Sequence, residues 1–294
     1  MPLKLPTIIG HRGNRQEVGY ENTVEVFEHA LQHSSGFETD IGLSKDNQIV
    51  IIHDTFYTGD AAFYELATRL DKPSQSIVGK KRIDEMDLSE IQQLRLINGH
   101  PIPVLDDLIS LIKKYPNKIY NIELKAPNSG CFMIERMIEK GISFDVGNIF
   151  FSSFNHAEIL SIRKRFPHIK LDTLFEPSNT NGCNMYPWFP HNASLYTPFS
   201  LENINNPIIR DINPEFFGLN EYDVRADVLS EIRKLYPTTK IYTWWYFSEP
   251  PPRENKRFIH TIKHLHRAGL LDMLAGVITD YPSEMTKMFE ENFS

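Results

Sequence analysis

Two histidines, three carboxylates, one arginine and one lysine stand where buried segments of this sequence end. His11 and Arg12 follow the apolar pair Ile8 and Ile9, within the run Ile9-Gly10-His11-Arg12-Gly13. The two glycines allow a tight turn and a close approach to a ligand. On their own, His11 would be read as a buried, hydrogen-bonded histidine and Arg12 as a surface cation. The residues further along the chain favour a functional interpretation.

Carboxylates occur at strand-like spacing in two segments. Glu38 and Asp40 lie two residues apart in an expected strand, so their side chains should point to the same face. The apolar residues that alternate with them pack outward, which leaves the carboxylates inside. Glu123 and Lys125 share the polar face of a second such segment, where an ion pair is the simpler interpretation if they are taken alone. Buried carboxylates are costly unless they are paired or bind a cation.

His53 ends a further apolar run and completes the set of chemically useful residues. Three carboxylates offer hard oxygen ligands, which suit Ca²⁺ or Mg²⁺ better than Zn²⁺ or copper. Two histidines, His11 and His53, suit a general acid and a general base. Arg12 and Lys125 are the side-chain types that bind phosphate oxygens. The combination predicts metal-assisted phosphoryl chemistry.

Strand-like and helix-like segments alternate along the chain, which is typical of an α/β protein with a parallel sheet. The expected strands are 7–10, 37–41, 119–124, 148–152, 171–175, 215–219, 240–245 and 276–279. A further run, 48–53, follows a turn at Lys45-Asp46-Asn47 and should pair with the second strand as a hairpin. The first helix should begin at Asn22, a good N-cap, with Glu25 in a capping-box position. We therefore expect a TIM (β/α)8 barrel with a small hairpin insertion after strand 2 and long loops at the catalytic face.

The chain has 294 residues, and a TIM barrel typically takes roughly 250. We expect a single domain over 1–294, with insertions near 42–100, 176–214 and 247–257. The last two follow strands and should lie at the face where barrel active sites form. Residues 176–214 are rich in Asn and Pro, so we expect turns there rather than regular elements. The aromatic Trp188, Phe189 and Tyr196 in this stretch either cover a substrate or pack against the barrel.

Charge and composition narrow the class of partner. The formal net charge is −7, which disfavours nucleic acid and anionic membrane surfaces as partners. No apolar run is long enough for a signal peptide or a membrane span. The two cysteines, Cys131 and Cys183, do not form a metal-type pair. We expect a cytoplasmic protein with no nucleic-acid partner and no integral membrane segment.

Eight short motifs follow one another along nearly the whole chain. They are His11-Arg12-Gly13, Glu21-Asn22-Thr23, Glu38-x-Asp40, His53-Asp54, Ile102-Pro103-x-Leu105, Glu123-Leu124-Lys125, Ser152-Ser153-Phe154 and Ile278-Thr279-Asp280-Tyr281-Pro282. In this order they resemble the glycerophosphodiester phosphodiesterase family. The resemblance implies a TIM barrel in which Glu38, Asp40 and Glu123 bind one divalent cation, Ca²⁺ or Mg²⁺. It also implies that His11 and His53 are the acid/base pair, with Arg12 and Lys125 on the phosphate.

The expected reaction is hydrolysis of a small glycerophosphodiester to sn-glycerol 3-phosphate and an alcohol. Three departures from the family pattern leave the head group open: Tyr20 in place of Pro, Thr55-Phe56-Tyr57-Thr58 after His-Asp, and Trp244-Trp245-Tyr246-Phe247 in place of Trp-Thr-Val-Asn. Trp244 is a candidate substrate-binding residue. One alternative is lysophospholipase D or phosphatidylglycerol phospholipase activity at the same site. The other is a phosphate-binding barrel without turnover, which the presence of all seven site residues disfavours.

Overall fold

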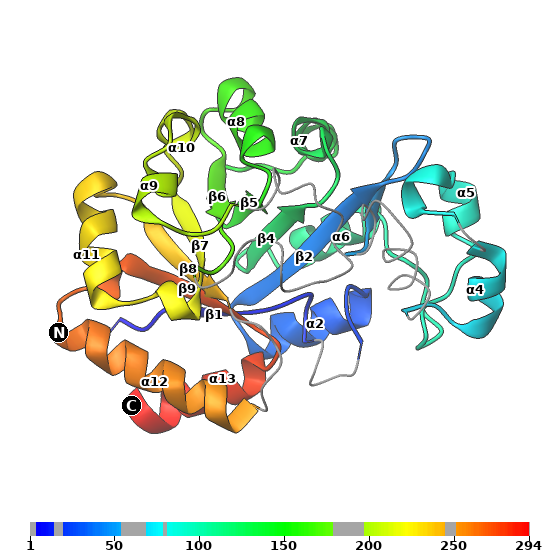
Figure 1. Ribbon diagram of the computed structural model, residues 1–294. Helices are drawn as coiled ribbons and strands as arrows, with labels where there is room; N and C mark the ends of the chain where they lie inside the picture. Colours follow the sequence, from blue (N-terminus) through cyan, green and yellow to red (C-terminus); the bar gives the residue numbers. More distant parts are fainter. Residues whose placement is uncertain are drawn as a thin grey trace.

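The computed structural model describes residues 4–14, 20–53, 69–78, 81–178, 197–244 and 251–293. Within these ranges, eight parallel strands close into a barrel because β1 pairs with β2 on one side and with β9 on the other. The order around the barrel is β1-β2-β4-β5-β6-β7-β8-β9, and helices cover its outside (Figure 1). The predicted TIM barrel is confirmed.

The strands are β1 (Thr7–Gly10), β2 (Gly36–Leu43), β3 (Ile49–Ile51), β4 (Ile119–Leu124), β5 (Ile149–Ser153), β6 (Lys170–Leu174), β7 (Phe216–Asn220), β8 (Lys240–Trp244) and β9 (Leu274–Thr279). The longer helices are α2 (Val24–His33), α6 (Leu105–Lys114), α7 (Ser129–Glu139), α8 (His156–Arg165), α11 (Ala226–Leu235), α12 (Pro251–Arg267) and α13 (Pro282–Phe293). Shorter helical segments are α4 (Lys72–Val78), η1 (Ile83–Glu85), α5 (Leu88–Ile91), α9 (Leu201–Ile204), α10 (Pro207–Ile212), η2 (Glu221–Asp223) and η3 (Leu271–Met273).

The predicted hairpin after the second strand is also present. β3 runs antiparallel to β2, with Ile51 opposite Ile41 and Ile49 opposite Leu43. The turn between them uses Asn47 at φ +57°, a left-handed conformation that Asn tolerates better than most residues. Every predicted strand therefore has a counterpart in the described structure.

Side chains alternate between the outside and the inside of the barrel, as strand geometry requires. Phe37, Ile41 and Tyr120 are fully buried in the cluster between the sheet and the helices. A smaller apolar cluster, formed by Ile9, Phe150, Tyr242 and Ile278, gathers separately. These residues come from β1, β5, β8 and β9, on the strand faces turned inward, and they form an apolar filling inside the barrel.

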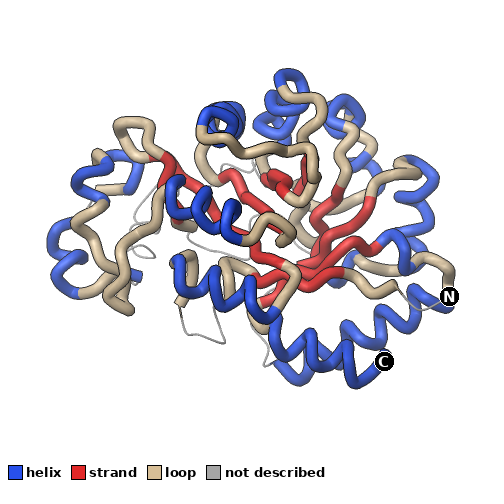
Figure 2. The backbone as a smooth tube through the Cα atoms, turned by 180° about the vertical axis from the view of Figure 1, so that it is seen from behind, coloured by secondary structure: helices blue, strands red, loops and turns tan. Residues whose placement is uncertain are grey.

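A segment after β3 has a core of its own. We call its described part, residues 69–78 and 81–104, the insert. Leu70, Val78 and Met86 of the insert pack with Val50 of β3 and with Ile52, which directly follows β3. This hydrophobic cluster is distinct from that of the barrel. Its helices α4 and α5 stand to one side of the barrel in both views (Figures 1 and 2).

Three local predictions need correction. The N-cap of α2 is Thr23, whose side chain accepts from the backbone N–H of Val26, whereas Asn22 adopts φ +50° and turns its side chain elsewhere. Residues 176–214 were expected to lack regular elements, but α9 and α10 lie there; Trp188, Phe189 and Tyr196 lie outside the described residues. The expected loop 247–257 becomes helical from Pro251, because proline is favoured at the first helical position.

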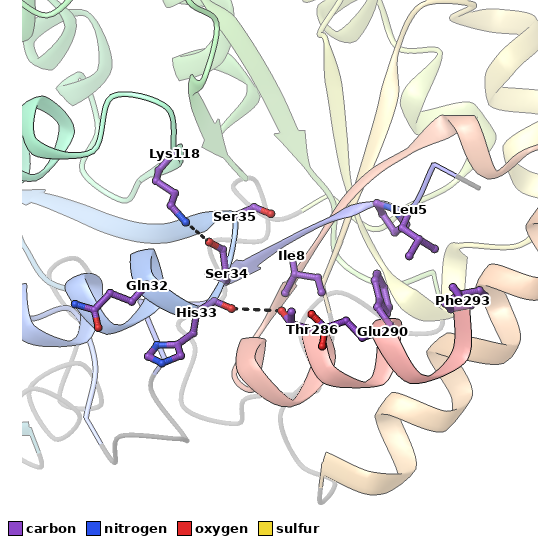
Figure 3. Close-up of a pocket in the computed structure, with 12 residues that line it drawn as sticks. Leu5, Ile8, Gln32, His33, Ser34, Ser35, Lys118, Thr286, Glu290 and Phe293 are labelled. Atoms are coloured by element: carbon purple, nitrogen blue, oxygen red, sulfur yellow. Dashed lines mark hydrogen bonds between the residues drawn. The ribbon is translucent and has the colours of Figure 1, made fainter. Parts of the chain in front are cut away.

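A cavity of about 530 Å³ lies at the amino ends of β1, β2 and β4 (Figure 3). It is lined by residues that include Leu5, Ser35, Lys118 and Phe289. The carboxyl ends of barrel strands carry the active site in enzymes of this fold, so this cavity lies at the opposite end. Among the helices that the structure describes, none combines the length and the hydropathy needed to cross a bilayer.

Candidate active site

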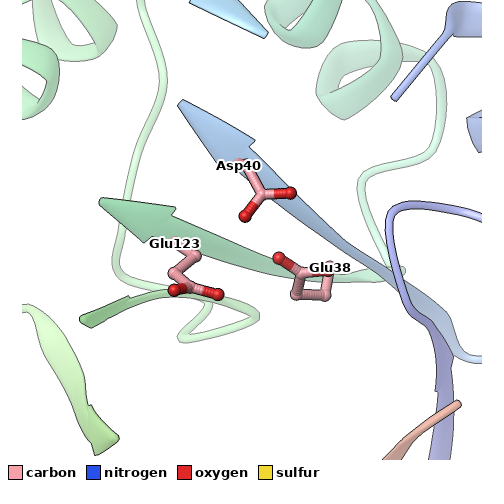
Figure 4. Close-up of side chains that lie close together, drawn as sticks. All are labelled: Glu38, Asp40 and Glu123. Atoms are coloured by element: carbon pink, nitrogen blue, oxygen red, sulfur yellow. The ribbon is translucent and has the colours of Figure 1, made fainter. Parts of the chain in front are cut away.

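Three carboxylates converge from two neighbouring strands. Glu38 and Asp40 project from β2 and Glu123 from β4 (Figure 4), and Asp40 and Glu123 are register partners. One oxygen atom from each residue lies within 4.8 Å of the other two. Glu38 and Asp40 are only 2% and 1% exposed. The three carboxylates therefore point into the barrel, as the alternation of side chains along the strands predicts.

The electrostatics of this cluster suit a divalent cation. Burial raises the pKa of Glu38 well above its ordinary value, and the charges of Asp40 and Glu123 raise it further. Among the described residues, Glu38 Oε1 is a buried oxygen without a hydrogen-bond donor. Buried oxygens that repel one another are stabilised by a shared cation. Each of the three residues offers oxygen atoms, the donor type that Ca²⁺ and Mg²⁺ prefer.

Two basic side chains flank the cluster. Arg12 Nε lies 3.3 Å from Asp40 Oδ2, and the Arg12 backbone N–H donates to Glu38 Oε2 at 2.8 Å. Lys125 Nζ lies 2.5 Å from Glu123 Oε1 and 3.5 Å from Asp40 Oδ1. Burial alone would raise the pKa of Asp40, but the charges of His53, Arg12 and Lys125 lower it to about 2.

The two histidines approach the carboxylates from different strands. His11 follows β1; its Nδ1 lies 2.7 Å from Asp280 Oδ1, and its Nε2 lies 4.0 Å from Glu38 Oε2. His53 follows β3 and is close enough to Asp40 for its charge to lower the pKa of that carboxyl. The adjacent Ile52 N–H donates to the Asp40 carbonyl at 3.1 Å, which ties the end of the hairpin to the site.

Trp244 ends β8 and lies near the lysine side of the cluster. Its ring meets the ring of Phe154 edge to face, with 6.0 Å between centroids. Lys125 Nζ lies 5.9 Å from the centroid of Phe154. The two aromatic rings and Lys125 therefore form one connected group. Trp245, Tyr246 and Phe247, as well as Asp54 and Thr55–Thr58, lie outside the described residues.

The model of the Glycerophosphoryl diester phosphodiesterase family matches residues 11–283, nearly the whole chain. The chain belongs to this family. A glycerophosphodiester phosphodiesterase from Caldanaerobacter subterraneus subsp. tengcongensis is 28% identical over 223 residues, which are 71% of this chain and 78% of that protein. The family resemblance inferred from the motifs is thus confirmed, and this family is one of phosphoric diester hydrolases.

Solved structures with the same fold support the architecture. A phosphodiesterase from Oleispira antarctica, in complex with the product sn-glycerol-3-phosphate, aligns with a TM-score of 0.67 at 20% identity, covering 97% of each chain. A glycerophosphodiester phosphodiesterase from Parabacteroides distasonis aligns with a TM-score of 0.64 at 17% identity, covering 98% of each chain. At these identities the likeness shows the shared fold.

The sequence predicted Asn22 only as a helix N-cap and gave Glu21 no role, whereas in the structure both side chains hold other site residues. Asn22 Nδ2 donates to Asp40 Oδ2 at 3.0 Å, and Asn22 Oδ1 accepts from Thr39 Oγ1. Glu21 Oε1 accepts from Arg12 Nη1 at 2.9 Å. These contacts explain why Asn22 is not the N-cap, because its side chain is hydrogen-bonded to Thr39 and Asp40 of β2.

Two further acidic residues were not assigned roles from the sequence. Asp280 follows β9 and is fully buried against His11; its place directly after an expected strand was the available signal. Asp172 lies on β6, fully buried, and a Cβ on Gly218 would stand 3.1 Å from its Oδ1. Burial raises the pKa of Asp172 well above its ordinary value, and the charge of Glu123 adds to this effect.

Proposed function

We propose that this protein is a metal-dependent phosphodiesterase that hydrolyses a glycerophosphodiester to sn-glycerol 3-phosphate and an alcohol. The observation that carries the proposal is the cluster of Glu38, Asp40 and Glu123, with mutual oxygen distances within 4.8 Å, beside two cations and two histidines. When bound there, a divalent cation such as Ca²⁺ or Mg²⁺ supplies charge stabilisation to a phosphoryl group.

The chain's own residues then divide the remaining work. The guanidinium of Arg12 and the ammonium of Lys125 bind the phosphate oxygens and offset the negative charge of the carboxylates. This local positive charge is needed because the chain as a whole carries −7, which opposes the approach of an anion. Trp244 contacts the part of the substrate beyond the phosphate.

His11 and His53 exchange protons with the substrate. His11 Nδ1 lies 2.7 Å from the buried Asp280 carboxylate. Because a carboxylate accepts hydrogen bonds, this contact favours a neutral ring with its proton on Nδ1, in which Nε2 takes up or gives back a proton. One imidazole removes a proton from the nucleophile, and the other protonates the departing alkoxide. Acid/base catalysis of this type contributes roughly 10²–10⁴-fold to the rate.

Product identification by ³¹P NMR tests the proposal. With glycerophosphocholine and added Mg²⁺ or Ca²⁺, the expected phosphorus product is sn-glycerol 3-phosphate. Faster turnover of lysophosphatidylcholine, with lysophosphatidate as the product, would favour the phospholipase alternative. Tight phosphate binding without any product from either substrate would overturn the enzymatic assignment.

A further inference from the structure

Arg69 is a basic residue that the insert holds in a fixed place. Its carbonyl accepts from the backbone N–H of Ile97 at 2.8 Å, and the neighbouring Leu70 forms an antiparallel bridge with Leu96. Leu70 is fully buried in the core of the insert. The position of the Arg69 backbone is therefore set by the folding of the insert.

The side chain of Arg69 reaches out of the insert to the site. Its Nη1 lies 2.7 Å from Glu21 Oε2, and the other oxygen of the same carboxylate, Oε1, lies 2.9 Å from Arg12 Nη1. Arg12 in turn contacts Asp40 through Nε at 3.3 Å. The Glu21 side chain is 7% exposed and that of Arg12 is 10% exposed, so water screens the contact between them weakly. The Arg69 side chain is 31% exposed, so its contact with Glu21 is screened more. One carboxylate thus bridges an arginine of the insert and an arginine of the site.

A second set of contacts joins the chain segment around Glu21 to the insert. Tyr20, which replaces the usual proline of the family, stacks on His100 of the insert with 6.0 Å between ring centroids. His100 Nδ1 also lies 3.0 Å from Glu25 Oε1. The insert therefore contacts the residues on both sides of Glu21 as well as Glu21 itself. Stacked rings at this spacing add to stability beyond the area they bury.

We propose that Arg69 is a positioning residue that orients Arg12 for phosphate binding by acting through Glu21. This inference rests on the proposed function, because it takes Arg12 to be a phosphate-binding group. Without Arg69, both oxygens of Glu21 become available to Arg12, which draws the guanidinium toward Glu21 and neutralises more of its charge. Both the displacement of the Arg12 guanidinium and the neutralisation of its charge lower the affinity for phosphate. Arg69 therefore acts on phosphate binding without touching the substrate.

Arg69→Gln tests the proposal, with Arg95→Gln as the matched control. Arg95 is another insert arginine, but its guanidinium donates to the carbonyls of Gln92 and Leu94 rather than to a site residue. For glycerophosphocholine we expect Arg69→Gln to raise KM about tenfold (about 1.4 kcal/mol) and to leave kcat within about twofold, because the lost binding is common to the substrate and the transition state. The inhibition constant of sn-glycerol 3-phosphate should rise by the same factor.

A cycle with Glu21→Gln separates positioning from structural support. If Arg69 acts through Glu21, adding Arg69→Gln to Glu21→Gln should change KM by less than about twofold. A merely structural role would lower the melting temperature and leave the KM of the folded fraction unchanged. Unchanged KM and inhibition constant in folded Arg69→Gln, equal effects of Arg95→Gln, or independent effects in the cycle would each overturn the inference.

Two further measurements keep the test decisive. Should Arg69→Gln fail to fold, Arg69→Lys decides, because an ammonium keeps the charge but not the planar fork; we expect KM to rise about two- to threefold, and a wild-type KM would refute the role. If the wild type turns over neither glycerophosphocholine nor lysophosphatidylcholine, the enzymatic assignment fails. The affinity of both proteins for sn-glycerol 3-phosphate, measured by calorimetry, then still decides, and equal affinities or no binding would reject the role of Arg69.

Discussion

Replacing Asp280 with Asn should slow the reaction by weakening the hold on His11. The carboxylate is fully buried, and its Oδ1 lies 2.7 Å from His11 Nδ1, whose side chain is 12% exposed. A hydrogen bond to a charged group is worth about 1.5–3 kcal/mol, and every 1.4 kcal/mol is about tenfold in rate. The neutral amide keeps the shape but not the charge, so we expect kcat to fall about 10- to 150-fold.

The assay is steady-state release of choline from glycerophosphocholine with a saturating divalent cation. KM should change little, because Asp280 contacts the imidazole rather than a phosphate-binding group. Asp272→Asn is the control: it precedes the same strand, β9, and pairs at the surface with Arg233 and Lys240. A folded Asp280→Asn enzyme whose kcat is within about twofold of the wild-type value would refute the reasoning.

Three further variants test the electrostatics of the barrel. Glu38→Gln and Glu123→Gln should each weaken cation binding, measured by calorimetry, and remove most of the activity; wild-type cation affinity in both would show that they are not ligands. Asp172→Asn should stabilise the chelator-treated protein at high pH. Burial raises the pKa of Asp172 in the folded state, so native Asp172 binds its proton more tightly than the unfolded chain does. The protonated residue therefore contributes to stability below its ordinary pKa of 3.8. This contribution is lost as the pH rises. Between about pH 5 and about pH 8 the melting temperature should therefore fall less for Asp172→Asn than for the wild type, and parallel curves would contradict this.

Much of the barrel could be predicted because its signals are local. The apolar run before His11 and the alternation around Glu38 and Asp40 both reflect which face of a strand is buried. The same alternation predicted that Glu123 points inward, since Tyr120 and Ile122 are buried on the opposite face. The division of the chain into domains and the chemical roles of these residues remain predictions.

The errors and omissions arise from contacts between distant parts of the chain. Asn22 has a good N-cap side chain, but Asp40 and Thr39 on another element engage it, so Thr23 caps the helix instead. Asp280 contacts His11 although 269 residues separate them in the sequence. Patterns of residue spacing describe local structure, so they do not predict this contact. The bridge from Arg69 to Glu21 likewise depends on how the insert packs against the barrel, and only the folded chain brings the two residues together.

Titration of a cation into the chelator-treated protein tests the central claim most directly. The claim is that Glu38, Asp40 and Glu123 hold one divalent cation on which hydrolysis depends. Activity toward glycerophosphocholine should be absent without the cation and should return with Ca²⁺ or Mg²⁺, in parallel with the binding of one ion per chain. Full activity in protein that carries no cation would contradict the account.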